Sequence, residues 1–195
     1  PDDGYYGNNV PMKYNFNNNF LRSYEQTRSN RHDLKKLPNG NFLILDDIRS
    51  LGPIPLGNWT DEFQDLGYEA DGETNEIDWL SQDIVELDEF GEEVWRWKFT
   101  DHILKEEYDI YAGTWWNALQ RGYYDWTHSN SIWFDSINNV IYLSVRHLSK
   151  ILKIDYPSGN IIWQIGLPEN LGLGNDNICT ELGFSWQHDV KLLDN

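Results

Sequence analysis

Histidine is the residue type in this chain with the clearest capacity for chemistry, because imidazole can act as a nucleophile, an acid–base group and a hydrogen-bond donor. The chain has five histidines. His32 and His188 each begin a His-Asp pair that precedes a turn-forming sequence by the same interval. His128 stands about two residues before the equivalent place in a middle copy. These matched positions suggest that the three imidazoles belong to one site.

The elements that must position these histidines are strand pairs that recur along the chain. Residues 32–45 contain the hairpin signal Asn39-Gly40, a turn in which both central positions favour positive φ. A looser copy occupies residues 131–143, with another asparagine pair at its turn, and a further copy begins at residues 188–195. We therefore expect each of these segments to form or begin a hairpin.

A second kind of strand pair follows the first. Residues 84–97 and 151–165 each contain a β-rich run, an Asp, a Gly-containing turn and a second run that includes Trp. One hairpin of each kind makes a four-stranded antiparallel unit. Repeated units of this type are typical of a β-propeller, so the sequence predicts an all-β fold.

The number of repeats predicts only part of a propeller ring. Blades are expected at about 28–98 and 125–166, with a third beginning near residue 184, so the partial propeller spans 28–195. Propellers close with about four to eight blades. We expect the ring to be completed by another chain, as in a homo-oligomer, or by further residues. Residues 1–27 form an N-terminal segment of unclear structure.

Equivalent positions on successive blades are related by rotation about the central axis, so the three histidines should meet at one end of the channel. Arg146 ends the returning strand of the middle hairpin, which places it near His128. Taken singly, each histidine is equally well explained as a core group that bonds to the backbone. Three at matched positions, together with an arginine, favour a site that binds an oxyanion.

Two insertions separate the repeats. Residues 46–80 are acidic and rich in turn formers, and we interpret them as a long solvated loop rather than a calcium site, because alternating Asp/Asn spacing is missing. Residues 99–127 are rich in Tyr and Trp and predict a short helix and a loop over one end of the propeller. His102 and His147 match no repeat position and are interpreted as surface or structural residues.

Composition limits the partners. The chain carries a net charge of −17, which disfavours nucleic acid and anionic membrane surfaces. No apolar run approaches the roughly 20 residues that span a bilayer, and no leader sequence begins the chain. Cys179 is the single cysteine, so a cysteine-based zinc site is excluded and we expect neither a metal nor another cofactor.

Several motifs together resemble the bacterial arylsulfate sulfotransferases. The resemblance covers roughly residues 30–195 and lies in the segments Asp125-Trp126-Thr127-His128-Ser129-Asn130-Ser131, Leu143-Ser144-Val145-Arg146, His32-Asp33, Leu37-Pro38-Asn39-Gly40-Asn41 and Gln187-His188-Asp189. It implies a six-bladed propeller that moves a sulfuryl group from an aryl sulfate to a phenol without a nucleotide sulfate donor. It further implies two half-reactions through a sulfated histidine, and a periplasmic or extracellular location.

The resemblance also assigns roles to residues. By position, His188 matches the nucleophile, and His32, His128 and Arg146 match the groups that hold the sulfuryl oxygens and assist proton transfer. Asp189 should not orient His188, because neighbouring residues of a regular strand face opposite ways. The residues expected to contact the substrate are Trp115, Trp116, Tyr123, Tyr124 and Asn130.

Two other functions fit parts of the sequence. A propeller of this kind can bind a ligand without catalysis. The spacing Asp88…Gly91…Trp95, repeated at 155–163, also resembles the blade signature of quinoprotein-type dehydrogenases, which need a bound quinone and a metal. The matched histidines favour sulfate chemistry. We expect the 195-residue chain alone to be inactive, because an open ring leaves strand edges unpaired.

Overall fold

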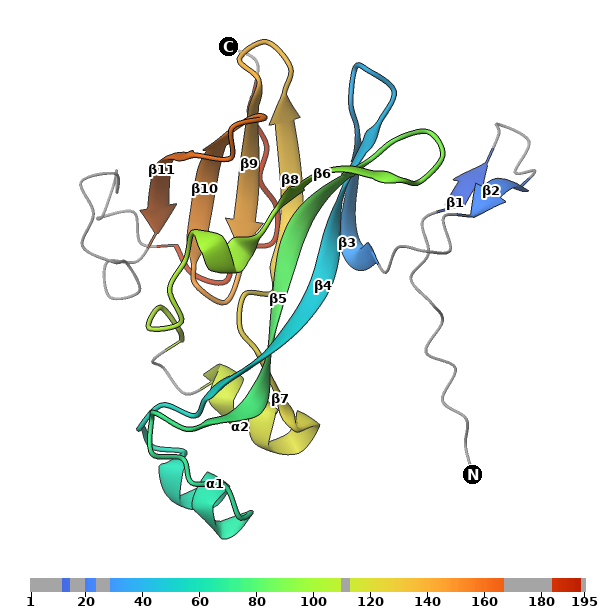
Figure 1. Ribbon diagram of the computed structural model, residues 1–195. Coiled ribbons are helices and arrows are strands. Elements are labelled where there is room, and N and C mark those ends of the chain that lie inside the picture. Colours follow the sequence, from blue (N-terminus) through green and yellow to red (C-terminus); the bar gives the residue numbers. More distant parts are fainter. Residues whose placement is uncertain (1–11, 15–19, 24–28, 110–112, 167–183, 194–195) are drawn as a thin grey trace.

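The computed structural model describes residues 12–14, 20–23, 29–109, 113–166 and 184–193 (Figure 1). Of the N-terminal segment 1–27, it describes a short antiparallel pair, β1 (Met12–Tyr14) and β2 (Phe20–Ser23). Cys179 and the turn residues 194–195 lie outside the described residues.

The first large sheet has four antiparallel strands bonded in chain order, as the first repeat unit predicts. Leu43, Ile44 and Leu45 are fully buried, so the strand that contains them packs on both faces. A short fifth strand pairs in parallel with the third. The strands are β3 (Ser29–Lys36), β4 (Phe42–Pro53), β5 (Asn75–Leu87), β6 (Glu93–Trp97) and the parallel β7 (Tyr123–Asp125).

The second large sheet repeats this antiparallel order and confirms the second predicted unit. Its strands are β8 (Ser129–Asp135), β9 (Val140–Val145), β10 (Lys150–Asp155) and β11 (Ile161–Gly166). The all-β class is therefore confirmed. Among the described residues the two sheets do not close into a ring, so the propeller itself stays a prediction.

The loop between β3 and β4 differs from the predicted two-residue turn. The Leu37 N–H donates to the Asn41 carbonyl (2.8 Å), and the Gly40 N–H donates to the Leu37 carbonyl (3.0 Å). Gly40 has a φ of 95°, whereas Asn39 is not in the left-handed region. The hairpin is confirmed, but its loop is wider, with Pro38 setting the first central position and glycine supplying the left-handed one.

Residues 46–80 are not the solvated loop that the sequence predicts. β4 and β5 stay paired as far as Pro53 and Asn75, so both arms of the insertion are largely strand. A short helix, α1 (Thr60–Asp65), lies between them, and the side chains of Trp59 and Phe63 are buried. The acidic residues obscured this structure, because the apolar side chains that stabilise it are few and widely spaced.

Residues 99–127 contain the predicted short helix. Trp115 of this helix stacks on Tyr124, with ring centroids 3.7 Å apart. Trp79 meets Tyr124 edge-on at 4.8 Å. Trp79 of β5 also meets Trp115 edge-on, so these rings form an aromatic cluster that packs the helix against β5. Figure 1 shows the helix beside this end of β5. The segment forms the 3-10 turn η1 (Phe99–Asp101), α2 (Gly113–Arg121) and β7.

Residues 184–193, where a third unit is expected to begin, form no strand within that described range. They form hydrogen bonds to β8, to the end of β9 and to Ser149 in the turn before β10. The third blade therefore stays a prediction.

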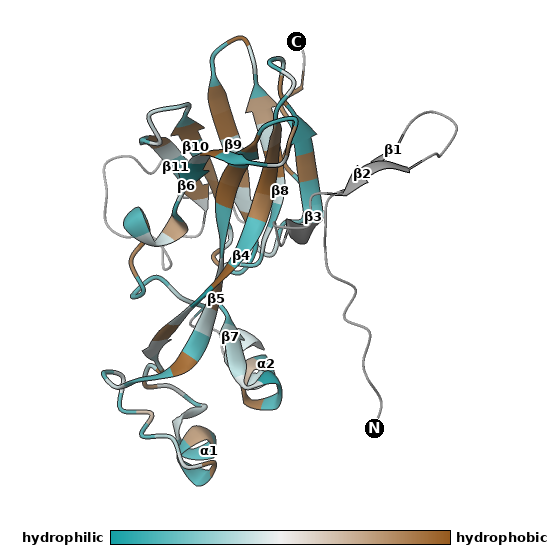
Figure 2. Cartoon of the chain, turned by 45° about the vertical axis from the view of Figure 1, so that its right-hand side comes forward, coloured by the Kyte–Doolittle hydropathy of each residue, from teal (hydrophilic) through white to brown (hydrophobic). Residues whose placement is uncertain are grey.

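Apolar residues concentrate on the strands of the two large sheets (Figure 2). They form one main core that both sheets share, including Leu45 and Ile84 from the first sheet and Leu143 and Leu152 from the second. No helix among the described residues has the length and apolar character needed to cross a bilayer.

The neighbouring tryptophans of α2 allow a matched test of this core. Trp115 is fully buried, whereas Trp116 is 37% exposed. We expect Trp115→Ala to lower the free energy of unfolding by about 3–5 kcal/mol, because it leaves a cavity inside the aromatic cluster. Trp116→Ala should change it by only about 0.5 kcal/mol. Urea denaturation followed by circular dichroism measures both, and equal losses would contradict the packing described.

Candidate active site

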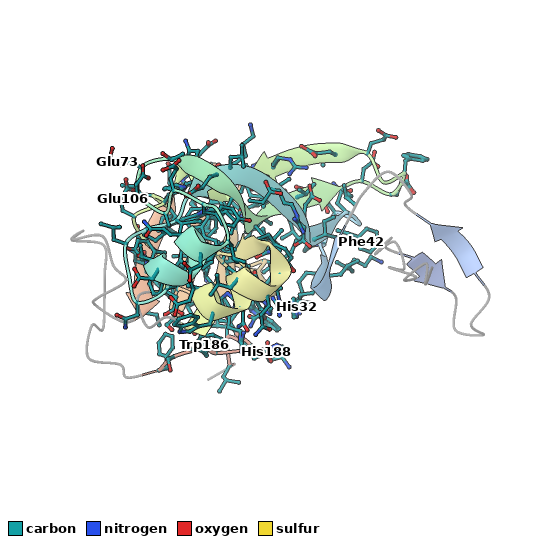
Figure 3. The ribbon with its side chains drawn as sticks, turned by 90° about the horizontal axis from the view of Figure 1, so that it is seen from below. His32, Phe42, Glu73, Glu106, Trp186 and His188 are labelled. Atoms are coloured by element: carbon teal, nitrogen blue, oxygen red, sulfur yellow. The ribbon has the colours of Figure 1, made fainter. Side chains whose placement is uncertain are left out.

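Three histidines from distant parts of the sequence meet at one end of the sheets. The His32 ring centroid lies 5.5 Å from that of His188 and 5.0 Å from that of His128. His147 continues the group, with its ring 4.6 Å from His128. His32 and His188 lie on the same side of the molecule, away from Glu73 (Figure 3). The matched sequence positions thus correspond to proximity in space.

Arg146 joins the group because of how the second sheet is paired. Ser129 at the start of β8 lies opposite Val145 at the end of β9, so the residues just outside both strands share one end of the sheet. Residues 146–149 form the turn into β10, closed by a bond from the Ser149 N–H to the Arg146 carbonyl (3.0 Å). His128 and Arg146 therefore lie at the same end of the second sheet, as predicted.

The hydrogen bonds of His147 define its tautomer. Its Nδ1 lies 2.5 Å from the main-chain oxygen of Asp125, which can only accept, so Nδ1 carries the proton. Its Nε2 then accepts a bond from Nη1 of Arg146 (3.0 Å). Burial lowers the pKa of His147 to about 4, and the nearby His128 and Arg146 act in the same direction. A neutral His147 thus holds the guanidinium in place.

Asp125 is the acidic partner of His128. Its Oδ2 lies 2.6 Å from Nδ1 of His128, and its side chain is 9% exposed. Burial favours the neutral acid, but the bond from His128 and the nearby His147 and Arg121 hold the pKa of Asp125 below its ordinary value. The ionised carboxylate accepts the Nδ1 proton, so Nε2 is the ring nitrogen of His128 that is left to exchange a proton with a substrate. His128 has a left-handed φ of 44°, as its place between Asp125 and β8 requires.

The segment that carries His188 is fixed on both sides of that residue. The Asn130 side-chain N–H donates to the Gln187 carbonyl (2.9 Å). The Ser131 hydroxyl donates to Asp189 Oδ1 (3.0 Å) and accepts a bond from the Val190 N–H (3.2 Å). Asp189 is therefore engaged by β8, and the imidazole between these anchored residues lies against His32.

His32 is positioned in a similar way. The carboxylate of the next residue, Asp33, accepts a hydrogen bond from the Ile132 N–H (2.8 Å) and so ties β3 to β8. Partial burial, together with the neighbouring His128 and His188, lowers the pKa of His32. This shift favours the neutral form of the ring.

The residues predicted to contact the substrate fall in different places. Trp115 and Tyr124 are fully buried in the aromatic cluster. Trp116 has an exposed face on α2, and Tyr123 lies beneath the Arg49 guanidinium, 4.2 Å from the ring centroid. Asn130 is buried, and its side chain donates to the Gln187 carbonyl, next to His188. Their contact with substrate stays a prediction.

Of the two histidines outside the matched set, one is at the site and one is not. His102 is stacked on Trp97 at 4.6 Å, with the rings nearly parallel. His147 is part of the cluster, which the repeat pattern did not indicate. Asp125 was missed as well. Their closeness in sequence to His128 and Arg146 was the available signal.

Asp125, His128 and His147 also form a set that could ligate a metal, because one ligand atom from each lies within 4.8 Å of the others. Both nitrogens of His147 are already engaged, by the Asp125 carbonyl and by Arg146. A cation at this set would have to displace one of these groups. The contacts therefore fit a hydrogen-bonded acid–base group better than a preformed metal centre.

A family comparison covers the whole of this site. The model of the family Arylsulfotransferase (ASST) matches residues 5–189, a range that includes every histidine of the chain. The chain belongs to the arylsulfotransferase family. A search of curated proteins gave no match. The described contacts join the histidines predicted from the repeats to Asp125, Arg146 and His147.

The low pKa of His147 makes the stability of this protein depend on pH. Unfolding restores an ordinary pKa near 6.5, so the unfolded chain binds more protons between about pH 4 and 6.5. This contribution is complete above pH 6.5 and is lost as the pH falls toward 4. It amounts to up to about 3 kcal/mol.

Comparison with His147→Asn isolates this contribution. The free energy of unfolding of the variant, measured by urea denaturation at each pH, should fall less steeply between pH 6.5 and 4 than that of the parent. His102→Asn, which lies outside the cluster, should leave most of the parent slope in place. Parallel profiles for the parent and His147→Asn would contradict a buried neutral His147.

Proposed function

We propose that this chain carries the catalytic centre for sulfuryl transfer from an aryl sulfate ester to a phenol, without a nucleotide sulfate donor. The observation that supports it most directly is the meeting of His32, His128 and His188 with Arg146, through His147, at one end of the sheets. Such a group combines a nucleophile with several donors for oxyanions. Membership of the arylsulfotransferase family supports the same class of reaction.

The first half-reaction forms a sulfated histidine. A ring nitrogen of His188 attacks sulfur, and the S–O bond to the aryl group breaks. The departing phenolate takes a proton from the imidazolium of His128. Sulfuryl transfer resembles phosphoryl transfer in spreading charge over three equatorial oxygens, so N–H groups of Arg146 and His32 contribute by binding those oxygens.

The second half-reaction returns the enzyme to its starting state. The oxygen of the acceptor phenol attacks sulfur, the N–S bond to His188 breaks, and the phenol proton passes to Nε2 of His128. Asp125 supports this role because its carboxylate holds the proton on Nδ1 and leaves Nε2 as the base. The two steps together exchange one phenol for another and return His188 to the neutral imidazole and His128 to the imidazolium.

The wider arrangement is proposed on the family resemblance. The two four-stranded sheets would be blades of a six-bladed propeller. The protein would work in the periplasm or outside the cell on small aryl sulfates and phenols. Activity tests accordingly use the full-length protein.

The test of the nucleophile is His188→Ala. Without an imidazole at this position no sulfated intermediate can form, and transfer from a chromogenic aryl sulfate to phenol should fall by about 10³-fold or more. Mass spectrometry of the parent after exposure to donor alone should find a sulfated peptide that contains His188. His102→Ala is the matched control and should keep the parent rate. Full activity in His188→Ala would refute the proposal, and bound donor without a sulfated peptide would favour a binding protein.

Asp125→Asn tests the acid–base pair separately from the nucleophile. The amide can donate to Nδ1 and reverse the tautomer of His128, so turnover with a phenol acceptor should fall by about 10²- to 10⁴-fold. A donor with a good leaving group needs little proton transfer in the first step. With nitrophenyl sulfate as the donor, the initial burst of released nitrophenol should therefore keep its amplitude, while the steady-state rate of transfer to the phenol falls.

Asp101→Asn, beside His102, is the control for removal of a carboxylate outside the cluster. It should match the parent in both phases. If the burst amplitude and the steady-state rate of Asp125→Asn fall together, Asp125 maintains the fold and has no specific role in the second half-reaction. Thermal unfolding of each variant provides the accompanying measure of structure.

A further inference from the structure

Trp186 stands two residues before His188 in an unusual conformation. Its φ is 56°, in the left-handed region that bulky residues rarely adopt, and its N–H donates to the Ser149 hydroxyl (3.3 Å). The residue is 36% exposed although the side chain is large and apolar. Strain of this kind persists where the surrounding structure enforces it, and it often marks a functional position.

The indole lies directly against the group that would bind the sulfuryl oxygens. Arg146 Cζ is 4.3 Å from the ring centroid, and the His147 ring is 4.9 Å away. The benzo edge faces Gly113 at the start of α2, where an added Cβ would lie 3.8 Å from it. Figure 3 places Trp186 on the same side of the molecule as His32 and His188. The ring is thus held between the β9–β10 turn and α2, with part of its surface open.

An aryl sulfate places its ring one ester oxygen away from the sulfur. If Arg146 binds the sulfuryl oxygens, that ring must lie within a few ångströms of the guanidinium, which is where the Trp186 indole begins. Trp115 and Tyr124 have no exposed surface to offer an aryl group. Aromatic rings pair favourably in offset or edge-to-face arrangements, and an indole provides a large surface for either.

We propose that Trp186 forms the aromatic wall of the substrate site and gives the centre its preference for aryl over alkyl sulfate esters. This inference rests on the proposed function and goes further, because it assigns the aryl subsite to a residue outside the predicted substrate contacts. The segment 184–193 then supplies two parts of the site, the nucleophile and the surface against which the leaving phenol lies.

Sulfonates test the aromatic wall formed by Trp186 without turnover, because their C–S bond is not broken and no sulfuryl group is transferred. Isothermal titration calorimetry of the full-length protein would measure the dissociation constants of benzenesulfonate and methanesulfonate, which share one anionic head group. Trp186→Leu should weaken benzenesulfonate binding about tenfold and methanesulfonate binding no more than about twofold. Trp186→Phe should restore most of the benzenesulfonate affinity. Phe90→Leu removes an exposed ring from the β5–β6 loop and should change neither.

Equal weakening of both sulfonates would overturn the proposal, because it would show that Trp186 acts by holding Arg146. Unchanged binding of benzenesulfonate would overturn it as well. The calorimetry measures sulfonate binding and not transfer. An active His188→Ala protein would therefore refute the sulfohistidine mechanism, while the test of Trp186 by sulfonate binding would remain valid. Sulfation of His188 in Trp186→Leu at saturating donor, detected by mass spectrometry, would support a role confined to binding the aryl group.

Discussion

The attachment of two separate segments to β8 is the constraint on which the site depends. Asp33 accepts the Ile132 N–H, and Asp189 accepts the hydroxyl of the neighbouring Ser131. Each anchored carboxylate fixes the position of its segment against β8, and the preceding histidine then meets its counterpart in the shared cluster. In each repeated His-Asp pair, the acid is the anchor and the imidazole is the group that meets its counterparts.

The electrostatics of the cluster are local. The chain carries a net charge of −17, yet surface charges are screened over about 8 Å at physiological salt. At the cluster, the ionised Asp125 faces His128 and Arg121. Arg146 is held by a neutral His147, and no carboxylate of the described residues pairs with it. A guanidinium held by a neutral acceptor keeps its full charge for an incoming anion. An acidic protein can in this way bind a small sulfate ester while it repels long polyanions.

The sequence predicted the structure best where repeated motifs indicate equivalent positions in the fold. The four hairpins at 32–45, 84–97, 131–143 and 151–165 form as predicted, and matched positions brought the histidines together. It failed where side chains act across the fold. Asp125, His147 and Trp186 depend on left-handed backbone at 128 and 186 and on the turn after β9, and none of these has a periodic signal. The prediction for residues 46–80 was wrong because their acidic composition suggested a solvent-exposed loop. A few buried aromatic side chains instead stabilise this segment as paired strands.

Gln187 explains how His188 and Arg146 keep a fixed separation. Its side-chain N–H group donates to the carbonyls of Val145 and Lys150, the residues that bound the turn carrying Arg146. Lys150 is itself buried and paired with Glu107, so the base of the turn is anchored in the core. Each such bond contributes only about 1 kcal/mol, but together they fix relative position. Because transfer depends on reacting groups held within about half an ångström, this preorganisation matters more to the site than the strength of any one contact.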